Sequence, residues 1–220
     1  MTDNPPDDIA NRRRSILAEL AAAHQPPPQL IAVSKSQPDA AIDAALAAGQ
    51  RVFGENRVQE AQKHWEPRRA AHPGLTLHLI GPLQTNKAED AVALFDVIQT
   101  LDRVKLADAL KAAMEKLGSR PKLLIQVNTG EEAQKAGVPP SGVGALLRHA
   151  REEAGLEVEG LMCIPPVEEP AGPHFALLKK IARDYGLAWL SMGMSGDYQL
   201  AARYGATHVR IGTALFGERG

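Results

Sequence analysis

Eight short apolar segments recur along the chain and alternate with longer stretches of helical spacing. The apolar segments are typical of buried strands and cover residues 30–34, 51–53, 75–80, 96–99, 122–127, 157–162, 187–191 and 208–211. The stretches between them are rich in alanine, leucine and charged residues, as at 39–49, 102–118 and 144–155. Several of these stretches end in glycine, the residue that most readily adopts the left-handed backbone at a helix C-terminus. The alternation predicts an α/β fold with a parallel sheet.

The number of strands favours one α/β architecture. Eight strand and helix pairs in a chain of 220 residues predict a single-domain (β/α)₈ TIM barrel over residues 1–220, with a doubly wound open sheet as the main alternative. Residues 1–29 are expected to form an N-terminal helix, over 7–24, and an extended proline-rich connector. Because almost nothing follows the eighth strand, this first helix is a candidate for closing the ring.

Composition and charge exclude several classes of function. The 25 basic and 26 acidic residues nearly cancel and form no long block of one sign, so no nucleic-acid or anionic membrane partner is indicated. The single cysteine, Cys163, excludes an internal disulfide framework and favours a reducing compartment. The N-terminal stretch lacks an apolar secretory core, and no apolar run is long enough to cross a bilayer. We expect a soluble, cytoplasmic protein.

Two glycine-rich turns follow the seventh and eighth predicted strands. They read "MGMSGD" at 192–197 and "GTALFG" at 212–217, and the first directly precedes a helical pattern. A lone Ser195 or Asp197 would most simply cap that helix. Two such turns after the last two strands of a barrel, however, are typical of its recurring phosphate site.

Lys35 follows the first predicted strand, in "LIAVSKSQPD". A lysine at a strand end is usually a solvated loop residue. In a closed barrel the first strand lies beside the eighth, which would bring Lys35 close to the predicted phosphate site. A lysine amine there can form an imine with a carbonyl compound. A barrel that brings a lysine beside a phosphate site indicates either a Schiff-base aldolase or a pyridoxal-phosphate site.

Six sequence blocks also resemble one known family. The blocks are "IAVSKSQP", "FGENRVQE", "HLIGPLQTNK", "QVNTGEEAQKAGV", "GLMCIPP" and "LSMGMSGDYQLAARYGATHVRIGTALFG". In this order they resemble the pyridoxal-phosphate homeostasis proteins, single-domain relatives of the alanine racemase N-terminal barrel. The resemblance covers nearly the whole chain beyond its first 30 residues.

The resemblance implies a cofactor, pyridoxal 5'-phosphate (PLP), the active form of vitamin B6. It implies that Lys35 carries PLP as a Schiff base and that Arg210 faces the pyridine nitrogen. Asn56 and His78 lie in blocks that line the floor and sides of the pocket. The phosphate cradle matches Ser195, Gly212 and Thr213, and its turn is shaped by Gly193, Met194 and Gly196.

Arg210 bears on whether such a protein turns over substrate. An arginine stays protonated, so it would leave the ring nitrogen unprotonated and the cofactor a weaker electron sink. If Val209 and Ile211 face the helices, strand alternation places Arg210 inside the barrel. In alanine racemases the second acid–base group comes from another domain and a second subunit. This chain ends three residues after Gly217, and we expect PLP binding with little or no turnover and no catalytic residue.

Other candidate residues have simpler interpretations. The seven histidines show no HxxxH or HExxH spacing, so no zinc site is expected. Cys163 is expected to pack as a small apolar residue. Lys135, in a charged loop at 130–137, matches a family lysine and is a candidate contact to PLP or a second molecule. Glu55 and Glu60 are interpreted as a loop residue and a helix-face residue, without a catalytic role.

Two classes of function remain open from the sequence. The first is a PLP-binding protein, a monomer, that buffers the cofactor or delivers it to PLP-dependent apo-enzymes. The second is an enzyme, either an amino-acid racemase-like catalyst or a Schiff-base aldolase whose substrate carries the phosphate.

Overall fold

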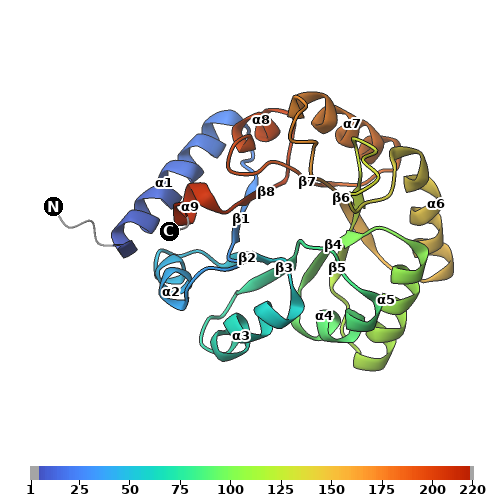
Figure 1. Cartoon of the computed structure of the whole chain (residues 1–220), viewed down its shortest axis with the longest axis horizontal. Helices are drawn as coiled ribbons and strands as arrows, with labels where there is room; N and C mark the ends of the chain where they lie inside the picture. The colour runs from blue at the N-terminus through green and yellow to red at the C-terminus, as the bar shows by residue number, and fades with distance from the viewer. Residues whose placement is uncertain (1–4, 219–220) are drawn as a thin grey trace.

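Residues 5–218, the part of the chain that this computed structural model describes, form a closed barrel of eight parallel strands (Figure 1). The strands are β1 (Gln29–Val33), β2 (Val52–Glu55), β3 (Thr76–Leu79), β4 (Val97–Leu101), β5 (Lys122–Val127), β6 (Val158–Cys163), β7 (Trp189–Ser191) and β8 (His208–Ile211). Each strand pairs with the next in the sequence, and β8 pairs with β1 through registers such as Ile31↔Arg210. The predicted barrel is confirmed, and the open sheet is excluded.

Helices surround the barrel and cover its outer face, as Figure 1 shows. They are α1 (Pro5–Ala23), α2 (Asp39–Ala47), α3 (Val58–Arg69), α4 (Ala88–Leu94), α5 (Val104–Leu117), α6 (Val143–Arg148), α7 (Ala171–Asp184), α8 (Tyr198–Arg203) and α9 (Thr213–Phe216). Short η1 (Thr85–Lys87) and η2 (Pro140–Gly142) precede α4 and α6, and η3 (His149–Glu153) continues α6 as a π-helical turn. Among the residues described, none of these helices is both long and apolar enough to cross a membrane.

Helix α1 fills the space between the last and the first helices of the ring. It contacts α2 on one side and α8 and α9 on the other. The carboxylate of Glu19 accepts hydrogen bonds from the Tyr198 hydroxyl and, at 2.6 Å, from Gln199 Nε2. The N-terminal helix therefore covers the seam where β8 meets β1.

Strand β2 is longer than the sequence predicted, because it includes Gly54 and Glu55. Gly54 faces the lumen, where a Cβ atom would lie 2.9 Å from Ile31 Cγ2 and 3.0 Å from Ile80 Cδ1. Glu55 points outward and is fully buried under α3, where side chains donate hydrogen bonds to it. Glycine and glutamate are both rare in strands, which is why the pattern placed this segment in a loop.

The side chains inside and outside the barrel differ in kind. Outward-facing residues form one large apolar core with the helices. The lumen holds a small apolar cluster of Val97, Leu124 and Met162, with Ile164 and Trp189 packed against it. The lumen also carries apolar Ile31 and Ile80, together with polar side chains that bond to one another across strands. A polar lumen at the carboxyl ends of the strands is where a barrel of this kind holds its site.

Candidate functional site

A cavity of about 360 Å³ opens at the carboxyl ends of the strands. Its lining residues come from the strand ends and the loops after them: Val33, Lys35, Gln37, Asn56, Ile80, Ile164, Met194, Ser195, Gly196, Arg210, Gly212, Thr213 and Gly217. Two of these are cations, Lys35 and Arg210, and none is an aspartate or a glutamate. The charge of this lining favours an anionic ligand.

Lys35 reaches this cavity from the turn that follows β1. Ser34 is buried, Lys35 is half-buried and Ser36 is exposed, so the lysine lies where the strand emerges from the core. Pairing of β1 with β8 brings this turn beside Gly212 and Thr213. The structure therefore unites the lysine with the glycine-rich turns, as closure of the barrel predicts.

The turn after β7 presents a serine hydroxyl to the cavity. Ser195 Oγ accepts a hydrogen bond from the Ala214 N–H at 3.2 Å and lies 3.5 Å from Thr213 Oγ1, which donates to it. The Ser195 hydroxyl hydrogen is thus free to donate to an oxygen in the cavity. The Asp197 carboxylate accepts from the Met194 N–H at 2.6 Å and fixes the turn before α8, and its side chain does not cap that helix.

Gly193 shapes this turn without lining the cavity. Its φ of +94° is in the region that favours glycine, and a Cβ atom there would lie 2.5 Å from Ala201 Cβ. Gly196 differs, because nothing lies within 4 Å of a Cβ built on it. Gly193 therefore sets the path of the backbone, while Gly196 leaves the mouth of the cavity open.

Arg210 is a buried cation whose partners are neutral. It is 3% exposed, and its guanidinium donates to Ser191 Oγ at 2.7 Å and to the Cys163 carbonyl at 2.8 Å. Among the described residues, no carboxylate forms an ion pair with it. Burial lowers its pKa from the ordinary arginine value, yet a guanidinium stays protonated in proteins. A buried charge without a counter-ion is costly, so an acceptor entering the cavity would stabilise it.

The structure places His78 outside this cavity, contrary to the expectation that it lines the pocket. Its neighbour two residues on, Ile80, lines the Lys35 cavity, so His78 lies one layer deeper in the lumen. His78 borders a larger cavity of about 670 Å³ at the opposite end of the barrel, together with His208 and Trp189. Burial, with a smaller contribution from His208, lowers the pKa of His78 to about 3. It is a neutral lumen residue that accepts at 2.7 Å from Gln99 Nε2.

Of the other residues singled out in the sequence, one lines the cavity and two do not. Asn56 lines it, directly after β2. Lys135 pairs instead with Glu132 at 2.6 Å and donates to the Pro165 carbonyl at 3.4 Å. Cys163 is fully buried, and burial raises the pKa of its thiol to about 12, as suits a packing residue.

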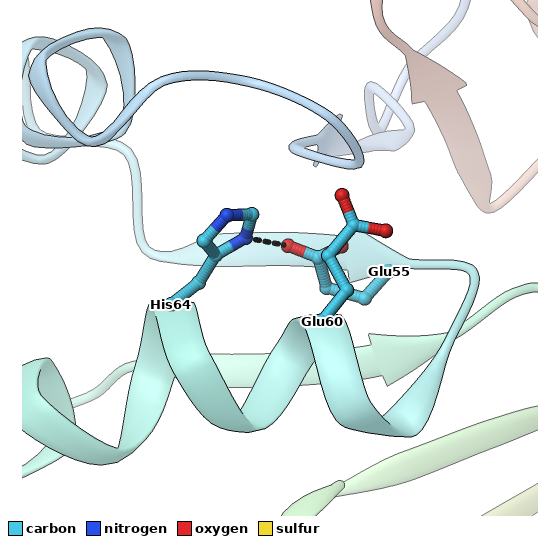
Figure 2. A group of neighbouring side chains, drawn as sticks. All are labelled: Glu55, Glu60 and His64. Atoms are coloured by element: carbon cyan, nitrogen blue, oxygen red, sulfur yellow. Dashed lines mark hydrogen bonds and ion pairs between the residues drawn. The ribbon is translucent and has the colours of Figure 1, made fainter.

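The structure also brings together three residues that sequence reasoning did not connect. Glu55, Glu60 and His64 are the described group of side chains close enough to hold a metal ion, with one ligand atom from each within 4.8 Å of the others (Figure 2). One oxygen of each glutamate already accepts hydrogen bonds from the protein. Glu55 Oε1 accepts from Ser34 Oγ at 2.7 Å and from His64 and Trp65 at 3.0 Å. The spacing of Glu60 and His64, four residues apart on one helix, was the one signal in the sequence.

Comparison with known proteins agrees with the fold and with the sequence blocks. The alanine racemase N-terminal domain family matches residues 12–220. The pyridoxal phosphate homeostasis protein of Vibrio cholerae is 44% identical over 203 residues, which are 87% of this chain and 85% of that protein. The human protein of the same name is 38% identical over 211 residues, covering 87% of this chain and 77% of its own length.

Solved structures also match this fold. PipY of Synechococcus elongatus with PLP bound is 41% identical, has a TM-score of 0.83 and aligns over 95% of this chain and 100% of PipY. Alanine racemase of Clostridium difficile shares the fold with a TM-score of 0.74 at 15% identity, and its match covers 57% of that enzyme. From the matched family model and these relatives, the chain belongs to the pyridoxal phosphate homeostasis protein family, built on the alanine racemase N-terminal barrel.

Proposed function

We propose that this chain binds PLP as a Schiff base on Lys35 and serves PLP homeostasis by buffering or delivering the cofactor, with little or no turnover. The observation that carries the proposal is one cavity that joins the Lys35 amine, the Ser195 and Thr213 hydroxyls and the Arg210 guanidinium, with no acidic side chain. The names of its relatives and the PLP bound to PipY support it.

Each of these groups suits one part of PLP. When bound, PLP supplies an aldehyde carbon and an electron-withdrawing pyridine ring. The Lys35 amine would hold the aldehyde end, and the Ser195 hydroxyl would donate to the phosphate, joined by the Thr213 hydroxyl once it turns from its 3.5 Å contact with Ser195. Arg210, with neutral partners only, would donate to the ring nitrogen. Cations and hydroxyls thus face an anionic ligand from several strands.

The cavity offers little for racemisation. Exchange of a proton on both faces of a substrate carbon needs two acid–base groups. The cavity lining contains no histidine, tyrosine, cysteine, aspartate or glutamate, so Lys35 is its one residue suited to that exchange among those described. Arg210 in place of a carboxylate would also weaken the ring as an electron sink. Both features favour binding of PLP over catalytic turnover.

Delivery, oligomeric state and location complete the proposal. Met194 is 38% exposed at the mouth of the cavity, which leaves a path for PLP to pass to PLP-dependent apo-enzymes. The chain would act as a monomer in the cytoplasm, where its one free, buried cysteine would stay reduced. Light scattering on purified protein tests the monomer, and transfer of PLP to an apo-transaminase tests delivery.

Covalent capture tests the central claim. The protein is mixed with PLP, its visible spectrum is recorded, the mixture is reduced with borohydride and the modified peptide is mapped by mass. We expect one pyridoxyl group on Lys35, none in Lys35→Ala and an unchanged adduct in Lys135→Ala. A protein that takes up no PLP contradicts the proposal. Racemisation of single-enantiomer amino acids by the loaded protein would favour the enzyme alternative instead.

A further inference from the structure

Two glutamates outside the cavity hold the serines on either side of Lys35. Ser34 Oγ donates to Glu55 Oε1 at 2.7 Å, and the backbone N–H of Ser36 donates to Glu60 Oε1. Figure 2 shows the two glutamates side by side, Glu55 from β2 and Glu60 from α3. Neither lines the cavity. They contact the segment that carries the lysine rather than the space the lysine enters.

The backbone around Lys35 needs such support. Ser36 has a φ of +57°, one of two non-glycine residues in the described chain with positive φ. A residue other than glycine adopts this conformation only when its surroundings enforce it. The Gln37 N–H donates to the Ser34 carbonyl at 3.1 Å and closes the turn over Lys35. The Glu60 carboxylate fixes the N–H of the strained residue.

Glu55 is itself held in place from α3. Its side chain is 0% exposed, and Oε1 also accepts from Trp65 Nε1 and His64 Nδ1, each at 3.0 Å. The other oxygen, Oε2, is buried without a partner among the described residues. Glu55 therefore satisfies three donors at once, and one of them belongs to the serine directly before Lys35. The carboxylate thus ties the start of the Lys35 turn to helix α3.

We propose that Glu55 and Glu60 are positioning residues that clamp Ser34 and Ser36 and thereby aim the Lys35 amine into the cavity. This inference rests on the proposed function. In the covalent step the Lys35 nitrogen forms a C=N bond with the aldehyde carbon, one water leaves and the ammonium proton goes to solvent. A lysine side chain has four rotatable bonds, so a fixed backbone raises the fraction of time its nitrogen spends near that carbon.

The test separates aiming of the lysine from binding of the phosphate and ring. Pyridoxamine 5'-phosphate carries an amine in place of the aldehyde, so it makes no bond to Lys35 and reports the other contacts alone. Two quantities are measured for each variant: the rate of borohydride-trapped adduct on Lys35 with PLP, and the Kd for pyridoxamine 5'-phosphate by equilibrium dialysis. Thermal melts of each variant verify that it is folded.

Glu60→Ala should slow covalent capture about tenfold and leave the Kd for pyridoxamine 5'-phosphate within about twofold. Glu60→Gln should restore most of the rate, because an amide oxygen still accepts from the Ser36 N–H. Ser34→Ala tests the Glu55 contact without removing the buried carboxylate and should also slow capture. Glu66→Ala, on the exposed side of the same helix, should match the parent protein.

The outcomes distinguish the two proposals. If the parent protein forms no adduct on Lys35, the proposed function fails. If it does, and Glu60→Ala and Ser34→Ala capture PLP at the parental rate, the positioning role is overturned. The positioning role is also overturned if the capture rate with PLP and the affinity for pyridoxamine 5'-phosphate fall by the same factor, since that result indicates a general structural role.

Discussion

Replacement of Ser195 by alanine tests the phosphate cradle directly. Ser195 Oγ already accepts from the Ala214 N–H and from Thr213 Oγ1, at 3.2 and 3.5 Å, so its own hydrogen is the donor available to an anion. A hydrogen bond to a charged group contributes ~1.5–3 kcal/mol. Its loss should weaken retention of PLP by about 10- to 150-fold. Thr213→Ala should have a smaller effect, because the Thr213 hydroxyl hydrogen already bonds to Ser195 Oγ.

The two hydroxyls lie close enough to act on the same phosphate, so the double variant should lose less than the sum of the single losses. Kd values from equilibrium dialysis, with Lys35 replaced by alanine in every sample, isolate these contacts from the covalent bond. Ser141→Ala, at an exposed position before α6, serves as the matched control. Retention within twofold of the parent in both single variants would refute the assignment of the cradle to these turns.

Three further predictions concern the frame of the barrel. Gly193→Ala should lower the melting temperature and weaken PLP retention, because its Cβ would lie 2.5 Å from a side chain of α8, whereas Gly196→Ala should not lower the melting temperature. Burial lowers the pKa of His78 to about 3 and of His208 to about 4, from 6.5. Between pH 6.5 and 4 the unfolded chain therefore binds protons that the native chain does not, and the free energy of unfolding should fall as the pH drops, by at most ~1.4 kcal/mol per pH unit per histidine. Urea titrations at several pH values measure this slope, and His78→Gln should reduce it. Cys163 should resist alkylation at pH 8 until the protein is unfolded, as mass spectrometry would show.

Local pattern and barrel geometry together were enough to predict most of the fold. Apolar segments identified all eight strands, because parallel strands buried on both faces are nearly continuous apolar runs. Closure of the ring then predicted that Lys35 meets Gly212 and Thr213, residues almost 180 positions away. Alternation around Val209 and Ile211 predicted the inward side of Arg210, which the structure shows buried in the lumen.

The sequence could not predict how deep a side chain lies in the lumen, nor which distant side chains contact each other. Alternation assigns His78 to the lumen but does not say which layer faces the mouth, and that depends on the stagger of neighbouring strands. The burial of Glu55 depends on donors from α3 and from the turn after β1. A charged residue at a strand end is ordinarily exposed, so no local pattern indicates three donors on one buried oxygen.

His78 lies at the end of a series of hydrogen bonds that begins at the buried Arg210. Arg210 donates to Ser191 Oγ, Ser191 donates to Gln99 Oε1 at 2.6 Å, and Gln99 donates to His78 Nδ1. In each of these hydrogen bonds the donor is the group nearer to Arg210, because a guanidinium can only donate. The last group in the series must therefore accept a hydrogen bond from Gln99. A neutral His78 imidazole can do so, whereas a protonated one could not. Burial keeps His78 neutral, so its Nδ1 can accept the last of the hydrogen bonds that begin at Arg210, one layer beneath the cavity that the sequence assigned it to.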